Sequence, residues 1–144
     1  MKTKTIFVEI ISFLFIILFV YAALTKLVDH ERFSVQIQQS ALLQPFSELI
    51  VWLVPLTEIV IAAMLMIFRF RLLALYLAFS LMVIFTSYIV VILNFVDRVP
   101  CSCGGILEKM GWTEHLVFNS FFVLIAFGAI RIMTKSDNES YAVS

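Results

Sequence analysis

The stretch of residues 72–96 constrains the fold more than any other feature of the chain, because it contains no Asp, Glu, Lys or Arg side chain. A helix of about 20 mainly apolar residues is long enough to cross the hydrocarbon core of a bilayer. Lipid offers no hydrogen-bond partners to the backbone, and a helix satisfies its polar groups internally. We therefore predict a membrane-spanning helix at residues 72–96.

Three further apolar stretches predict spanning helices at residues 6–27, 46–68 and 112–133. The first is too long for the apolar region of a signal peptide and carries Glu9, so we interpret it as a retained helix. Apolar residues make up 62% of the chain and charged residues 14%, against roughly a quarter charged in soluble domains. The sequence thus predicts an all-α fold, a transmembrane bundle of four helices.

That bundle is expected to form one domain, residues 1–133, followed by a polar and disordered cytoplasmic tail at residues 134–144. The net charge is zero, so nothing indicates a nucleic-acid partner, and the oligomeric state stays open. An even number of crossings places both termini on one side. Six Lys and Arg residues fall on that side and four on the other, which favours cytoplasmic termini in a bacterial inner membrane.

The first outer segment, between the first two predicted spans, has the pattern of a short amphipathic helix. Phe33, Ile37 and Ala41 recur at i, i+4 and i+8, with polar residues between them. We expect this helix to lie on the membrane surface. In the third predicted span, Ala74 and Ala78 are small enough to let a neighbouring helix approach closely.

The second outer segment holds both cysteines, Cys101 and Cys103, and would face the oxidising periplasm. Two cysteines separated by one residue would close a small, strained ring, and strained, exposed disulfides exchange readily. A redox function is therefore the leading interpretation. A static disulfide or two packed thiols is the second, although so short a ring closes almost no chain loop and stabilises little.

A metal site is the third interpretation of the cysteine segment. Cys101, Cys103 and His115 are ligands suited to Cu(I) or Zn²⁺, but no fourth protein ligand is evident and the spacing matches no zinc motif. We therefore predict no metal site.

Polar residues open the last predicted span directly after the cysteine segment. Trp112, His115 and Asn119 fall at i, i+3 and i+7 and share one helix face. Tryptophan is common at the membrane interface and a lone histidine is often structural. A histidine beside two thiols can also pass protons to them or to a quinone headgroup.

Two charged residues complete the candidate site. Glu58 lies near the middle of the second span, one turn after Pro55, at a depth where a carboxyl has to be buried in the bundle. It would handle protons or a quinone, or simply bond a neighbouring helix. Lys26, at the outer end of the first span, would extend to the interface or cap a polar site with Asp29 or Glu48.

These residues carry a resemblance to a known family. The segment 21–27, Tyr-Ala-Ala-Leu-Thr-Lys-Leu, resembles the G-x-x-K-L segment of DoxX-like membrane proteins, with alanine in place of the usual glycine. The segment around Pro55 and Glu58, and Cys101-Ser-Cys103-Gly followed by Trp112 and Asn119, is similar to the methylamine-utilisation MauE family. The resemblance extends from about Ile6 to Ile130.

The resemblance implies a four-helix membrane protein that supports maturation of disulfide-containing exported proteins alongside a thioredoxin-like partner. It also implies kinship with quinone-linked membrane oxidoreductases. Those enzymes use a C-x-x-C pair and a second cysteine pair, whereas this chain has one C-x-C pair. Electrons would therefore pass directly between Cys101, Cys103 and the partner.

The leading prediction is a membrane thiol–disulfide oxidoreductase with Cys101, Cys103 and His115 as catalytic residues. Its quinone would be bound by four further side chains, those of Lys26, Glu58, Trp112 and Asn119. The alternatives are a non-enzymatic membrane scaffold with a structural Cys-Ser-Cys turn, and a small metal or solute carrier. The direction of electron flow stays open.

Overall fold

The computed structural model describes residues 2–95 and 111–143, and within these ranges the chain is helical and contains no strand. The long helices are α1 (Lys2–Val28), α3 (Ser47–Met66), α4 (Arg71–Phe95) and α5 (Trp112–Val143). A shorter helix, α2 (His30–Gln39), and a 3-10 turn, η1 (Gln44–Phe46), lie between α1 and α3, and a second 3-10 turn, η2 (Phe68–Phe70), lies between α3 and α4.

Among the described residues, four helical segments are long and apolar enough to cross a membrane: Lys2–Val28, Gln44–Met66, Phe68–Phe95 and Trp112–Ser136. The first coincides with α1, and the last is the greater part of α5. The predicted fold class, an all-α membrane bundle of four spanning helices with a short outer helix, is confirmed.

The predicted disorder of the polar tail is wrong for residues 134–143, because α5 continues to Val143. A helix that is already nucleated gains one backbone hydrogen bond for each residue added, so extension past the membrane boundary is easier than starting a new helix. Within this helix the side-chain Oγ1 of Thr134 also donates a hydrogen bond to the carbonyl of Ile130, at 2.8 Å.

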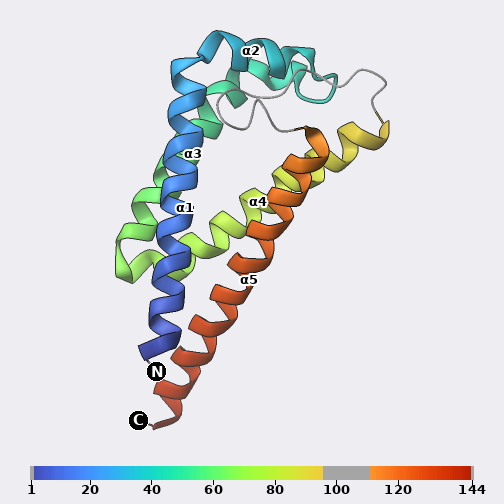
Figure 1. The fold of residues 1–144 in the computed structure, drawn as a ribbon. Helices are drawn as coiled ribbons and strands as arrows, with labels where there is room; N and C mark the ends of the chain where they lie inside the picture. Colours follow the sequence, from blue (N-terminus) through green and yellow to red (C-terminus); the bar gives the residue numbers. More distant parts are fainter. Residues whose placement is uncertain (1, 96–110, 144) are drawn as a thin grey trace.

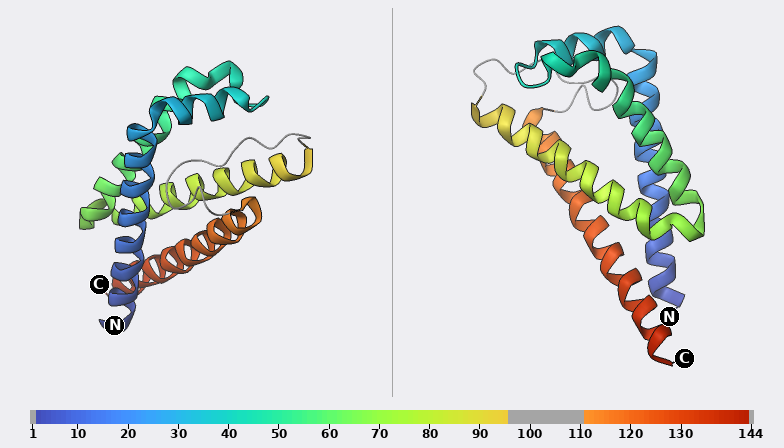
Figure 2. Two further views of the ribbon diagram at one scale, coloured as in Figure 1. Left: turned by 45° about the horizontal axis from the view of Figure 1, so that its top comes forward. Right: turned by 180° about the vertical axis from the view of Figure 1, so that it is seen from behind.

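The helices are arranged as two antiparallel pairs, with α1 packed on α3 and α4 packed on α5 (Figure 1). Both chain ends lie at one end of the bundle, and α2 lies at the other. The two pairs meet near the end that carries the termini and diverge toward α2, as the view from behind also shows (Figure 2). The helix pairs are therefore in contact at one end of the bundle, the closed end, and apart at the other, the open end.

The principal apolar core lies where the two pairs meet. Phe15 of α1 and Leu65 of α3 are fully buried there. Small residues let α4 and α5 approach each other, and all four of them are 0% exposed: Ala74, Ala78, Ala126 and Ala129. Close backbone approach at small residues is the usual way in which helices associate in lipid. Lipid tails are as apolar as the helix surfaces, so no hydrophobic effect drives the helices together.

A second, smaller core holds α2 against the outer end of α3. Phe33 and Ile37 of α2 are buried with Val51 of α3. The predicted amphipathic helix is thus present, but its apolar face packs on the bundle instead of on lipid. The prediction that Ala41 continues the apolar face of this helix is wrong, because α2 ends at Gln39 and Ala41 lies exposed in the following turn.

Candidate functional site

A cavity of about 340 Å³ lies between the diverging helix pairs and beneath α2. Residues from all five helices line it. Five of the residues predicted for the site are among them, and they come from α1, α3 and α5: Lys26, Glu58, Trp112, His115 and Asn119. The fold therefore brings together side chains that lie as far apart as 93 positions in the sequence (26 to 119).

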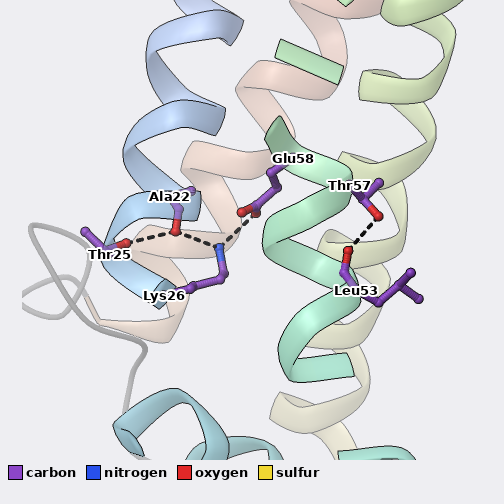
Figure 3. Close-up of polar contacts among 6 residues, drawn as sticks. All are labelled: Ala22, Thr25, Lys26, Leu53, Thr57 and Glu58. Carbon is purple, nitrogen blue, oxygen red and sulfur yellow. Dashed lines mark hydrogen bonds and ion pairs between the residues drawn. The ribbon is translucent and has the colours of Figure 1, made fainter. Parts of the chain in front are cut away.

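An ion pair between α1 and α3 lies in the wall of this cavity (Figure 3). Lys26 Nζ lies 2.8 Å from Glu58 Oε1, close enough for an ion pair with a hydrogen bond. The Glu58 side chain is 1% exposed and that of Lys26 is 16% exposed. Because charges are expensive inside a membrane, the pairing accounts for how both residues are accommodated at this depth.

The surroundings of Lys26 hold its ammonium group in the cavity. Nζ lies 3.4 Å from the carbonyl of Ala22, which also accepts a hydrogen bond from Thr25 Oγ1 (Figure 3). The rings of Phe33 and Phe85 lie 5.9 and 6.0 Å from Nζ, within the range of cation–π attraction. The Ala22 carbonyl, the Glu58 carboxylate and the two aromatic rings thus all stabilise the positive charge of Lys26.

The predicted partners of Lys26 need correction. Lys26 was expected to extend to the interface or to cap a polar site with Asp29 or Glu48, and the structure places Glu58 beside it instead. The reason is the antiparallel packing of α1 on α3, which sets the last turn of α1 beside the middle of α3. Asp29 does line the same cavity.

Pro55 leaves a backbone carbonyl of α3 without its helical donor, one turn before Glu58. Pro55 lies inside α3 and is buried, and it has no N–H with which to donate to the carbonyl of Val51. One turn later, Glu58 points toward α1 from the same helix (Figure 3). Polar backbone and polar side chain therefore occur on neighbouring turns of α3.

Two buried polar atoms of the site have no hydrogen-bond partner among the described residues. They are Oε2 of Glu58, an acceptor, and Nδ2 of Asn119, a donor. Asn119 is only 4% exposed. A buried polar atom left without a partner costs about 1–3 kcal/mol, so these two atoms are the candidate hydrogen-bonding groups of the cavity for a ligand.

The start of α5 fixes the position of the aromatic and polar residues of the site. The carboxylate of Glu114 accepts a hydrogen bond at 3.1 Å from the backbone N–H of Gly111, which is half of a capping box. The helix therefore begins at Trp112, and the predicted face of Trp112, His115 and Asn119 is turned toward the cavity.

The predicted redox residues Cys101 and Cys103 lie outside the described residues. In the sequence they fall between the end of α4 at Phe95 and the start of α5 at Trp112. Both of these helices contribute to the cavity wall.

The aromatic residues of the cavity wall that were not predicted as part of the site include Phe33 of α2 and, on α4, Phe85 and Tyr88. Phe33 was interpreted as a membrane-facing residue of the amphipathic helix. A signal existed for the other two, since Leu81, Phe85 and Tyr88 recur at i, i+4 and i+7 on one face of α4. In a span without charges that face is hard to tell from the lipid-facing side.

Comparison with known proteins supports the MauE part of the resemblance. No curated protein and no solved structure matched the chain. The model of one protein family, described as methylamine utilisation protein MauE, matches residues 4–132 and so covers all four membrane spans almost completely. The DoxX-like likeness is compatible with the helical membrane fold and stays a prediction. With the match extending over most of its length, the chain belongs to the MauE family.

Proposed function

We propose that this protein is a membrane thiol–disulfide redox protein. It exchanges electrons between an extracytoplasmic thioredoxin-like protein and a membrane quinone, and it supports the maturation of exported proteins. The observation that carries the proposal is the convergence of Lys26, Glu58, His115 and Asn119 on one cavity inside the bilayer-spanning part of the chain.

The polar groups of the cavity suit both redox forms of a quinone headgroup. Asn119 Nδ2 and Lys26 Nζ are donors for a carbonyl oxygen, and Glu58 Oε2 is an acceptor for the hydroxyl of a quinol. Aromatic and aliphatic side chains make up the remaining wall, as is usual for sites that bind small apolar molecules. When bound, a quinone would supply a two-electron, two-proton acceptor.

The thiol chemistry would proceed by disulfide exchange. A thiolate of the reduced partner attacks the Cys101–Cys103 disulfide, giving a mixed disulfide and one free thiolate. The second thiol of the partner then breaks the mixed disulfide, so the partner leaves oxidised and Cys101 and Cys103 are left reduced. Re-forming their disulfide releases two electrons and two protons, which a quinone takes up. The reverse sequence would reduce the partner and consume a quinol.

Residues of the cavity would manage the protons released by the two thiols. His115 lies twelve positions after Cys103 in the sequence and lines the cavity with Glu58. An imidazole and a carboxyl in one cavity offer two sites that can each take up a proton. The proposal concerns thiol chemistry and does not depend on methylamine.

The proposed location is a bacterial inner membrane with both termini in the cytoplasm. The bias of Lys and Arg toward the terminal side supports this orientation. Cys101 and Cys103 would then face the periplasm, where an exchange partner with a thioredoxin fold can reach them.

A redox titration of the two cysteines tests the proposal. The protein is reconstituted in nanodiscs, equilibrated in dithiol buffers of known potential, and alkylated so that mass reports the thiol state. We expect a reversible two-electron transition between roughly −120 and −270 mV, the range of known exchange proteins. Cysteines that stay reduced or oxidised at every potential would contradict the proposal and favour a membrane scaffold.

A further inference from the structure

A second cavity, of about 750 Å³, lies at the opposite end of the bundle from the first, where α1 begins and α5 leaves the membrane-spanning part. Lys4, Arg131 and Lys135 line it, and all three side chains are exposed. None of the described residues that line it is acidic. The cavity is therefore positively charged and open to the surface.

The wall of this cavity changes from apolar to basic along α5. Phe127 packs against Phe79 of α4, with the ring centroids 6.3 Å apart. One turn further along, the guanidinium of Arg131 lies 5.7 Å from the Phe127 ring. Lys135 follows after another turn, about 12 Å from Phe127 along the helix axis. Both Arg131 and Lys135 thus lie beyond an aromatic wall at the edge of the bilayer.

The position of the cavity matches the level of lipid headgroups. The candidate span of α1 begins at Lys2 and that of α5 ends at Ser136, so Lys4 and Lys135 each lie close to a membrane boundary. Tyr76 of α4 also lines the cavity, and its phenol adds a hydrogen-bonding group to the wall. Basic pockets between spanning helices bind anionic lipid headgroups through their phosphates.

We propose that this second cavity binds the phosphate headgroup of an anionic phospholipid. Arg131, Lys135 and Lys4 contact the phosphodiester, and the acyl chains lie against Phe79 and Phe127. Free phosphate is also an anion, but it has no acyl chains that could pack against the aromatic wall. This site is distinct from the first cavity, which Lys26 and Glu58 line, so this proposal can be tested independently of the proposed function.

The test is native mass spectrometry of the full chain, released from detergent, after titration with phosphatidylglycerol or with phosphatidylcholine of the same acyl chains. The variant Arg131→Gln/Lys135→Gln removes two charges from the cavity. The variant Lys2→Gln/Arg69→Gln removes two basic residues of the same membrane side that do not line the cavity. Inorganic phosphate is titrated as a third ligand against each protein.

We expect wild-type protein to retain phosphatidylglycerol over phosphatidylcholine, and the cavity variant to lose this affinity roughly tenfold or more. The control variant should lose much less. Equal losses in the two variants would mean general attraction to a basic surface and would overturn the proposal. So would equal retention of the two lipids, or displacement of phosphatidylglycerol by millimolar phosphate, which would identify a site for free anions.

Discussion

The two ends of the bundle are built differently, although the same four helices form both. Where the pairs meet, alanines on α4 and α5 are fully buried and the core around them is apolar. Where the pairs diverge, the interior holds an ion pair, a buried amide and a cavity of about 340 Å³. The closed end accounts for how the helices associate, and the open end holds the cavity on which the proposed function rests.

The difference follows from which residues each helix presents along its length. A helix in lipid needs small residues or polar contacts to associate with its neighbours. The closed end uses small residues, and the open end uses the Lys26–Glu58 contact between α1 and α3. Changes at the open end should therefore affect activity most, and changes in the apolar core of the closed end should affect stability alone.

The largest expected effect comes from the cysteines themselves. Cys101→Ser or Cys103→Ser removes one of the two sulfurs that form the exchanging disulfide, so thiol–disulfide exchange should fall to background in either variant. Helical content and thermal stability should stay close to wild type. The measurement is the rate at which a reduced thioredoxin-like dithiol is oxidised by protein in nanodiscs. Full activity in both variants would exclude the redox proposal.

The ion pair offers the next largest effect and separates stability from function. Glu58→Leu leaves the charge of Lys26 without its carboxylate, and breaking a buried ion pair costs about 3–5 kcal/mol. The double variant Lys26→Leu/Glu58→Leu should recover most of that stability, because well-packed apolar residues often replace a buried pair without loss. Both variants should lose quinone-dependent activity.

Thermal unfolding in detergent, followed by circular dichroism, gives the stability of these variants. If the double variant were as unstable as Glu58→Leu alone, the pair would be needed to hold α1 on α3. If the double variant kept full activity, the pair would have no part in the redox site.

Parts of this comparison were predictable from the sequence, for identifiable reasons. The spans follow from uncharged runs such as residues 72–96, because the requirement for about 20 apolar residues is set by the bilayer. Glu58 and Asn119 stood out because polar groups are rare at such depth. Their joint location was not predictable, since it depends on how the helix pairs diverge.

Two predictions about local contacts failed. Lys26 was expected to extend to the interface or to cap a polar site with Asp29 or Glu48, whereas its partner is Glu58, 32 positions away on α3. Ala41 was placed on the face of α2, whereas the helix ends before it at Gln39. Helix packing decides the partner of Lys26, and the apolar repeat of Phe33, Ile37 and Ala41 does not report where α2 ends.

Asn119 should give a smaller effect in which activity and stability change in opposite directions. Asn119→Leu removes a buried donor that has no partner among the described residues, so stability should stay equal or rise by up to about 1–3 kcal/mol. The affinity for a quinone should fall about tenfold, as one hydrogen bond to the ligand is lost. A KM series with a short-chain quinone measures the second effect. A marked loss of stability with unchanged KM would assign Asn119 to packing.

The smallest effect on function is expected at the closed end. Ala78→Leu adds bulk at a fully buried contact of α4, and overpacking of this kind costs about 1–3 kcal/mol. Leu77→Ile, at an exposed position of the same helix, is the matched control and should be neutral. Quinone affinity should be unchanged in both. A loss of affinity in Ala78→Leu without a loss of stability would show that the two ends are coupled.

The coupling of the cysteine pair to quinone tests the central claim most directly. Protein with reduced Cys101 and Cys103 is placed in nanodiscs free of quinone, a short-chain ubiquinone or menaquinone is added without oxygen, and thiols and quinol are both counted. The account predicts that one quinol forms for each disulfide, and that Glu58→Gln slows the reaction while the protein stays folded. Thiols that remain reduced in the presence of either quinone, yet are oxidised by a disulfide buffer, would contradict it.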